Sequence, residues 1–174
     1  MPRREIAPPA DDEYPPAVGE YLQELTGTEL FPILEAQMPA LRARLRISEE
    51  KALHRYEPEK WTVKELLVHM ADSERVFAYR ALRIARGDET PLPGYDEQAY
   101  AATSGASSRP LASIIEELES IRRATLTLLG SLDEEGLSRR GVANARVVSA
   151  RALAWVIAGH WAHHDRILSE RYGI

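Results

Sequence analysis

Three of the chain's five histidines lie close together, in the segment His160-Trp161-Ala162-His163-His164. Positions i and i+4 of a helix lie one turn apart on the same face, so the imidazoles of His160 and His164 can point at one place in space. His163, three positions after His160, is the rival second member of the pair. Imidazoles at this spacing are typical ligands of a divalent transition metal.

A third imidazole is available from another helical segment. His69 lies one turn after Leu66 and next to Met70, on the apolar side of that segment, so it can face the same interior. Imidazole nitrogens suit zinc, nickel, copper and iron, and three protein ligands leave a coordination position open for water. The pKa of water on such a metal can fall from near 16 to about 7, which provides hydroxide at neutral pH.

Carboxylates near these histidines are the candidate catalytic groups. Asp72, three positions after His69, and Asp165, next to His164, could each orient a ligand or act as a general base. Glu74 is a third candidate base by spacing. The competing interpretation is that all three carboxylates are merely solvated.

A structural interpretation of the histidines also stays open. A histidine on an apolar helix face is often a hydrogen-bonded core residue, because buried polar rings need partners. On this view the three imidazoles would bind no metal. His163 is predicted to support the site or to lie at the surface, and His54 to be structural or exposed.

Four segments have the apolar spacing of three and four residues that is typical of one helix face. The second begins with a capping box, Thr62 and Glu65, and is expected to end at Gly87. Ser149 can cap the last segment. Pro39 predicts a kink or short break in the first. The segments are residues 30–45, 62–87, 111–130 and 149–168.

No convincing strand separates these segments, so their apolar faces can be buried only against one another. The predicted fold class is therefore all-α, a four-helix bundle. Residues 1–18 are predicted to form an extended proline-rich arm outside the core, and residues 19–174 a single domain. Residues 88–108 are rich in proline, glycine and serine and predict a long functional loop, in which Tyr95 and Tyr100 could line a cleft or simply anchor the loop.

Composition excludes several classes of function. A net charge of -5 over 174 residues argues against nucleic acid and anionic membrane surfaces as partners. No apolar stretch approaches the roughly 20 residues needed to span a bilayer and no apolar signal core begins the chain, so we expect a cytoplasmic protein. The absence of cysteine excludes disulfides, thiolate metal sites and cysteine nucleophiles.

Three motifs follow one another in a specific order and spacing. They are Lys60-Trp61-Thr62-Val63-Lys64-Glu65 leading to His69-Met70-Ala71-Asp72-Ser73-Glu74, then Thr90-Pro91-Leu92-Pro93-Gly94-Tyr95-Asp96-Glu97, and last Gly159-His160-Trp161-Ala162-His163-His164. With these motifs the chain resembles, from about Tyr56 to Tyr172, the DinB/YfiT-like family of metal-binding four-helix bundles.

The resemblance implies an up-down-down-up bundle with a long crossing loop. It also implies a divalent metal held by three histidines, most often nickel or zinc. Iron is a further candidate because imidazole nitrogens also suit it. Carried onto this sequence, those ligands are His69, His160 and His164, which selects His164 over His163. Activities in the family include thiol-dependent S-transfer and isomerisation with bacterial low-molecular-weight thiols, and metal-dependent hydrolysis.

Two classes of function follow from these observations. The first is a metal enzyme that ionises either water for hydrolysis or the thiol of a small cosubstrate for transfer. The second is a non-catalytic stress-response or binding module in which the metal only joins two helices. A pocket at the metal would favour the enzyme, and a site closed on all sides the module. A homodimer is a further hypothesis.

Overall fold

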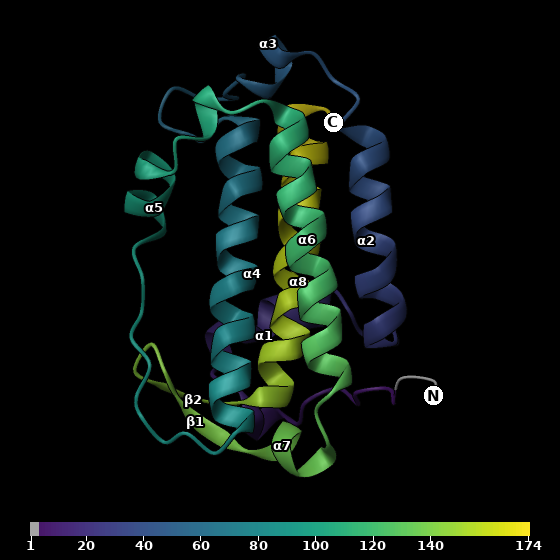
Figure 1. Cartoon of the computed structure of the whole chain (residues 1–174), viewed down its shortest axis with the longest axis vertical. Coiled ribbons are helices and arrows are strands. Elements are labelled where there is room, and N and C mark those ends of the chain that lie inside the picture. Colours follow the sequence, from purple (N-terminus) through teal and green to yellow (C-terminus); the bar gives the residue numbers. More distant parts are fainter. Residues whose placement is uncertain (1–3) are drawn as a thin grey trace.

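The computed structural model describes residues 4–174, and within them four long helices run along the longest axis of the molecule (Figure 1). The first runs up in the view of Figure 1, the next two run down, and the last returns upward, so the two downward helices are joined by a connection that crosses the length of the bundle. The predicted all-α, up-down-down-up bundle with a long crossing loop is confirmed. The four helices are α2 (Leu30–Arg44), α4 (Val63–Ala85), α6 (Leu111–Gly130) and α8 (Ala150–Tyr172).

The helix starts follow the capping signals in the sequence. Thr62 Oγ1 accepts a hydrogen bond from the amide of Glu65, and the Glu65 carboxylate accepts one from the amide of Thr62, which completes the predicted capping box of α4. Ser149 caps α8 through the amide of Ala152. The break allowed for at Pro39 is absent, since α2 is continuous through it. Proline removes only one backbone hydrogen bond, and the buried side chains around Pro39 hold the helix in place.

The connections contain short elements that the periodicity did not predict. They are α1 (Pro16–Gln23), α3 (Glu49–Ala52), α5 (Glu97–Thr103), α7 (Glu134–Ser138), the strands β1 (Arg140–Ala143) and β2 (Arg146–Ser149), and 3-10 turns at Asp11–Glu13 and Ala106–Ser108. Part of residues 88–108 is therefore helical, because Asp96 caps α5 by accepting hydrogen bonds from the amides of Gln98 and Ala99.

The β-hairpin contradicts the expectation that the chain has no strand. β1 and β2 pair antiparallel, with Arg140 opposite Ser149, and turn through Asn144 and Ala145, which both have positive φ. Such turns usually carry Asn-Gly, and the alanine hides the signal. The amide of Leu92 donates to the carbonyl of Val142, so the hairpin also holds the crossing connection.

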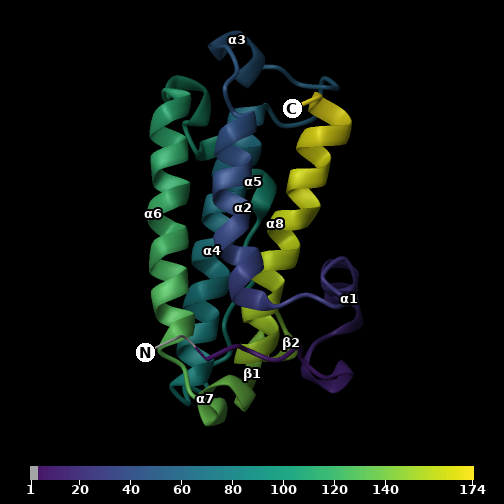
Figure 2. The same cartoon turned by 90° about the vertical axis from the view of Figure 1, so that its right-hand side faces the viewer.

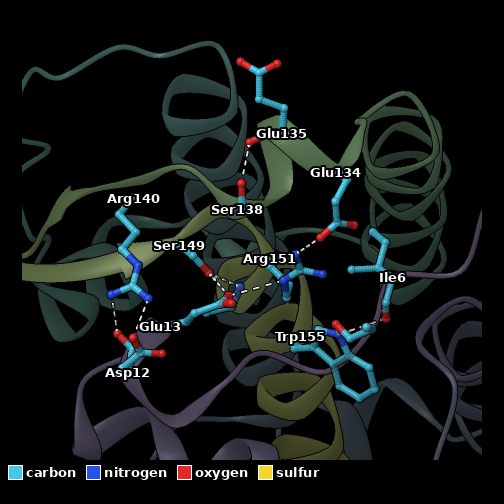
Figure 3. A network of polar contacts seen from close by, with 12 residues as sticks. Ile6, Asp12, Glu13, Glu134, Glu135, Ser138, Arg140, Ser149, Arg151 and Trp155 are labelled. Carbon is cyan, nitrogen blue, oxygen red and sulfur yellow. Dashed lines mark hydrogen bonds and ion pairs between the residues drawn. The ribbon is translucent and has the colours of Figure 1, made fainter.

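The N-terminal segment packs under the bundle instead of extending away from it. Ile6 is 2% exposed and belongs to the core, so the expectation that residues 1–18 stay outside the core is wrong at this position. The indole of Trp155 donates to the carbonyl of Ala7, and Glu13 contacts Ser149 and Arg151 (Figure 3). A proline-rich segment that cannot fold alone is thus fixed by side chains of the bundle. The predicted boundary at residue 18 falls inside α1.

A buried ion pair joins the four long helices at their centre. The guanidinium of Arg122 in α6 donates to both carboxylate oxygens of Glu74 in α4, each over 2.9 Å. Its remaining nitrogen donates to the Leu34 carbonyl and the Gln37 side chain of α2, and its central carbon lies 4.3 Å from the centre of the Trp161 ring in α8. These hydrogen bonds offset the cost of burying two charges.

None of the helices in residues 4–174 has both the length and the apolar character needed to cross a membrane.

Candidate metal centre

α4 and α8 pack against each other and bring three imidazoles to one point. The Nε2 atom of His69 lies 3.2 Å from that of His160 and 3.1 Å from that of His164, and the last two are 3.0 Å apart. Tetrahedral zinc with Zn–N bonds of 2.0–2.1 Å places two ligand nitrogens about 3.3 Å apart. The three nitrogens therefore match the donor set and the spacing of a divalent metal ion, and they could hold one.

Burial keeps these imidazoles neutral. His69, His160 and His164 are 4%, 6% and 7% exposed. Burial, followed by the nearby His163, lowers the pKa of His69 to about 4. Burial and then His69 lower the pKa of His160 to about 3, and burial and then His160 lower the pKa of His164 further. Each therefore has a free lone pair at neutral pH, as a metal ligand requires.

Aromatic rings pack against two of the three histidines, His69 and His160. The ring of Trp61 lies 4.6 Å from that of His69, while Phe77 and Tyr21 meet the ring of His160 edge-on at 5.4 and 5.7 Å. Tyr21 belongs to α1, which lies beside α8 (Figure 2). These contacts restrict the imidazoles of His69 and His160 to the orientation in which their Nε2 atoms converge.

Close packing of α1 on α8 depends on Gly159, the residue before His160. A Cβ atom at this position would overlap the backbone carbonyl of Tyr21. We therefore expect Gly159→Ala to displace α1 and to lower the free energy of unfolding by about 1–3 kcal/mol, the usual cost of overpacking. Urea unfolding checks this result. Ala124→Gly, at an exposed position of α6, is the helix-propensity control. An unchanged midpoint for Gly159→Ala would contradict the packing described.

Two hydroxyl groups lie beside the histidines. The Oγ atom of Ser73, which is fully buried, is 3.4 Å from Nε2 of His69 and 2.7 Å from the hydroxyl of Tyr95. Burial raises the pKa of Tyr95, so this phenol stays protonated. Tyr100 packs against Tyr95 and is 47% exposed. Ser73 was not predicted, although its position one turn after His69 places it on the same helix face.

A pocket of about 210 Å³ opens beside His164. Gln98 of α5 lines it, so the crossing connection contributes to its wall, whereas neither Tyr95 nor Tyr100 is part of the wall found in residues 4–174. The pocket is lined by Tyr56, Glu59, Lys60, Trp61, Leu66, Gln98, His164, Ile167 and Tyr172. The three-histidine group is thus adjacent to a space that a small molecule could occupy.

Comparison with known proteins identifies the family. The model of the DinB superfamily matches residues 33–168. This chain belongs to the DinB superfamily. Two relatives are each 30% identical to it: "Putative metal-dependent hydrolase OB0413" of Oceanobacillus iheyensis, over 73% of this chain and 76% of the relative, and "Putative metal-dependent hydrolase" of Bacillus pumilus, over 63% of each.

A solved structure shares the fold of this DinB chain. YfiT from Bacillus subtilis, described as "a probable metal-dependent hydrolase with an unusual four-helix bundle topology", matches with a TM-score of 0.73 over 96% of this chain and 94% of its own. The sequence identity is 19%, so the match shows the fold alone.

Two of the three candidate carboxylates lie away from the histidine group of this DinB bundle and pair with arginines. Glu74 is the buried partner of Arg122, and Asp165 pairs with Arg44 of α2. Neither is available as a base at the histidines, which corrects the sequence-based expectation. Asp72 lies 3.2 Å from Arg75, and burial raises its pKa; its role as a base stays a prediction.

The other two histidines lie outside the group. His163 is half-buried and meets the ring of Tyr21 edge-on at 5.4 Å, while His54 is exposed. The geometry therefore brings together the set that the family resemblance implied and leaves the rival His163 out of it.

The neutral imidazoles predict a pH dependence for the metal-free protein. Their pKa values are lower in the folded state than the ordinary 6.5, so unfolding takes up protons between pH 6.5 and the folded values of about 4 and 3. The free energy of unfolding should therefore fall as pH falls from 6.5, by roughly 1.4 kcal/mol per pH unit for each such histidine. Urea midpoints between pH 7.5 and 5, with chelator present, measure it. A flat profile would show that these imidazoles are accessible to protons in the folded state.

Proposed function

We propose that this protein is a metal-dependent hydrolase whose divalent ion is held by Nε2 of His69, His160 and His164. The observation that carries the proposal is the convergence of three buried, neutral imidazoles, one of which, His164, lines a pocket. Zinc and nickel fit three imidazoles, and iron is a third candidate. When bound, the metal would supply a Lewis acid that lowers the pKa of water. The names of the two relatives support hydrolysis.

The chain's own groups divide the remaining tasks. The imidazoles stay neutral because they are buried, and the aromatic rings against His69 and His160 fix the orientation of these two. Tyr95 does not line the pocket, but its phenol contacts Ser73, whose hydroxyl lies 3.4 Å from Nε2 of His69. We assign to this phenol a hydrogen bond to the carbonyl oxygen of a substrate bound at the metal. Such a donor stabilises the negative charge that develops on this oxygen during hydrolysis.

The pocket favours an enzyme over a module in which the metal only joins two helices. His164 lines the pocket together with Gln98 of the crossing connection. A purely structural site would be closed to small molecules on all sides. A low-molecular-weight thiol as cosubstrate and a homodimer stay predictions from the sequence.

A paired assay tests the proposed function. Tag-free protein is stripped with chelator, reloaded with zinc or nickel, and assayed against nitrophenyl esters, anilides, and a glutathione-like thiol with an aryl halide; His160→Ala prepared in the same way is the blank. Ester or anilide cleavage that requires both the metal and His160 is the expected result. Conjugation of the thiol without cleavage would replace hydrolysis by S-transfer. Full metal loading without either activity would favour the structural module.

Tyr95 provides a sharper prediction about the same reaction. We expect Tyr95→Phe to lower kcat about a hundredfold, since it removes one donor to the developing oxyanion. Metal content should not change, because the phenol is not one of the three nitrogens. Tyr100→Phe is the matched control, an exposed tyrosine that packs on Tyr95. Equal kcat values for the parent and Tyr95→Phe would remove Tyr95 from the reaction.

A further inference from the structure

Apolar side chains form the larger part of the pocket beside His164. Three aromatic side chains, Tyr56, Trp61 and Tyr172, and the aliphatic side chains of Leu66 and Ile167 form most of its lining. Aromatic and aliphatic surfaces favour an apolar ligand, because burying that ligand removes apolar area from water. The lining therefore selects for the apolar part of a substrate.

The aromatic walls are fixed before any ligand arrives. The hydroxyl of Tyr172 donates to the backbone carbonyl of Trp61 over 2.5 Å, and its ring meets that of Tyr56 edge-on at 5.0 Å. The other side of the wall is equally restricted, since the Trp61 ring packs on His69 at 4.6 Å. A planar ligand would lose little affinity to the ordering of these side chains.

Charge at the pocket does not favour an ionic ligand. The charged residues of the lining are Glu59 and Lys60, which are both exposed and have opposite signs. Gln98, also exposed, contributes a neutral amide. A phosphate or carboxylate substituent of a ligand would therefore meet no buried cationic side chain among the residues that line this pocket. Proteins usually bind such anionic groups through an arginine or lysine side chain.

The volume of the pocket narrows the class of ligand further. A cavity of about 150 Å³ lined by apolar side chains is enough to bind benzene. The pocket of about 210 Å³ therefore has room for one six-membered ring with a short linker.

We propose that the pocket formed by Tyr56, Trp61, Leu66, Ile167 and Tyr172 binds a single aromatic ring of the substrate and thereby places the adjoining carbonyl at the three-histidine centre. This inference rests on the proposed function and gives it a substrate class, esters or amides of small aryl acids. Trp61 is central to the arrangement because it contacts both the pocket and His69.

Two hydroxamic acids with the same chelating group test the inference without an assay of activity. Acetohydroxamic and benzohydroxamic acid are titrated calorimetrically into zinc-loaded protein. We expect the phenyl compound to bind at least about tenfold more tightly than the methyl compound, because burial of the ring adds apolar contact. In the NMR spectrum, the phenyl compound should also shift the indole N–H signal of Trp61 more than those of the two buried tryptophans, Trp155 and Trp161.

Two variants fill the pocket from different elements. Ile167→Trp does so from α8, and Gln98→Trp from an exposed position of α5, where a larger side chain is compatible with folding. Both should abolish the preference for the phenyl compound and leave the affinity for acetohydroxamic acid within about threefold. Gln98→Ala, which opens the rim, should keep the preference.

The outcomes separate this inference from the proposed function. Equal affinities for the two compounds in the parent, or a preference that survives in both pocket-filling variants, would overturn the aromatic pocket alone. Failure of zinc-loaded protein to bind either compound would overturn the accessible metal centre and the pocket inference with it.

Discussion

Replacing His160 with alanine is expected to weaken zinc binding by at least about a hundredfold, since even the outer partners of a metal ligand are worth 10–100-fold. The Nε2 atom of His160 lies 3.2 Å from that of His69 and 3.0 Å from that of His164. Its loss leaves only two ligand nitrogens, one on α4 and one on α8. Competition with a chromogenic chelator measures the affinity, and circular dichroism checks that the helices persist.

The adjacent His163 provides the control for this prediction. Its ring packs against Tyr21 and lies outside the three-nitrogen group, so His163→Ala should keep the affinity within about threefold. His69→Ala should behave like His160→Ala, although it alters a different helix. A loss of zinc with His163→Ala and its retention with His160→Ala would show that His163 binds the metal in place of His160, and that the proposed ligand set is wrong.

The second large effect concerns the buried ion pair. Arg122→Met should lower the free energy of unfolding by about 3–5 kcal/mol, because it leaves the carboxylate of Glu74 without its partner in the core. The double variant Glu74→Leu with Arg122→Met removes both charges and should recover most of the loss, since apolar side chains of similar volume often replace such pairs without cost. Urea unfolding at pH 7 measures both.

An exposed ion pair is the reference for this experiment. Asp12 and Arg140 contact each other at the surface, so Asp12→Asn should leave the urea midpoint almost unchanged. If Arg122→Met were as mild as Asp12→Asn, water would reach Glu74 in the variant and the ion pair would not be a determinant of stability. If the double variant were no more stable than the single one, the contact of Arg122 with Trp161 and Gln37 would be the larger contribution.

Local signals in the sequence predicted the elements that carry the histidines. The capping box at Thr62 and the cap at Ser149 fixed where α4 and α8 begin, and the spacing of four between His160 and His164 placed both on one face of α8. His69 followed from its place on the apolar face of α4. These inferences succeed because helix starts and helix faces depend on residues within one or two turns.

The features that the sequence did not predict depend on distant contacts. Asp165 pairs with Arg44, 121 positions away, and Glu74 with Arg122, 48 positions away, so neither partner is visible in a local pattern. The contact between Ser73 and Tyr95 requires the crossing connection to return to α4. The hairpin was missed because Ala145 occupies a left-handed position usually held by glycine.

The most direct test of the central claim is X-ray absorption at the zinc edge of tag-free protein loaded with one zinc ion per chain. We predict a first shell of three imidazole nitrogens at about 2.0–2.1 Å, completed by one or two oxygens, with the imidazole contribution reduced in His160→Ala. A first shell without imidazole, or a spectrum unchanged by His160→Ala, would contradict a metal centre formed by His69, His160 and His164.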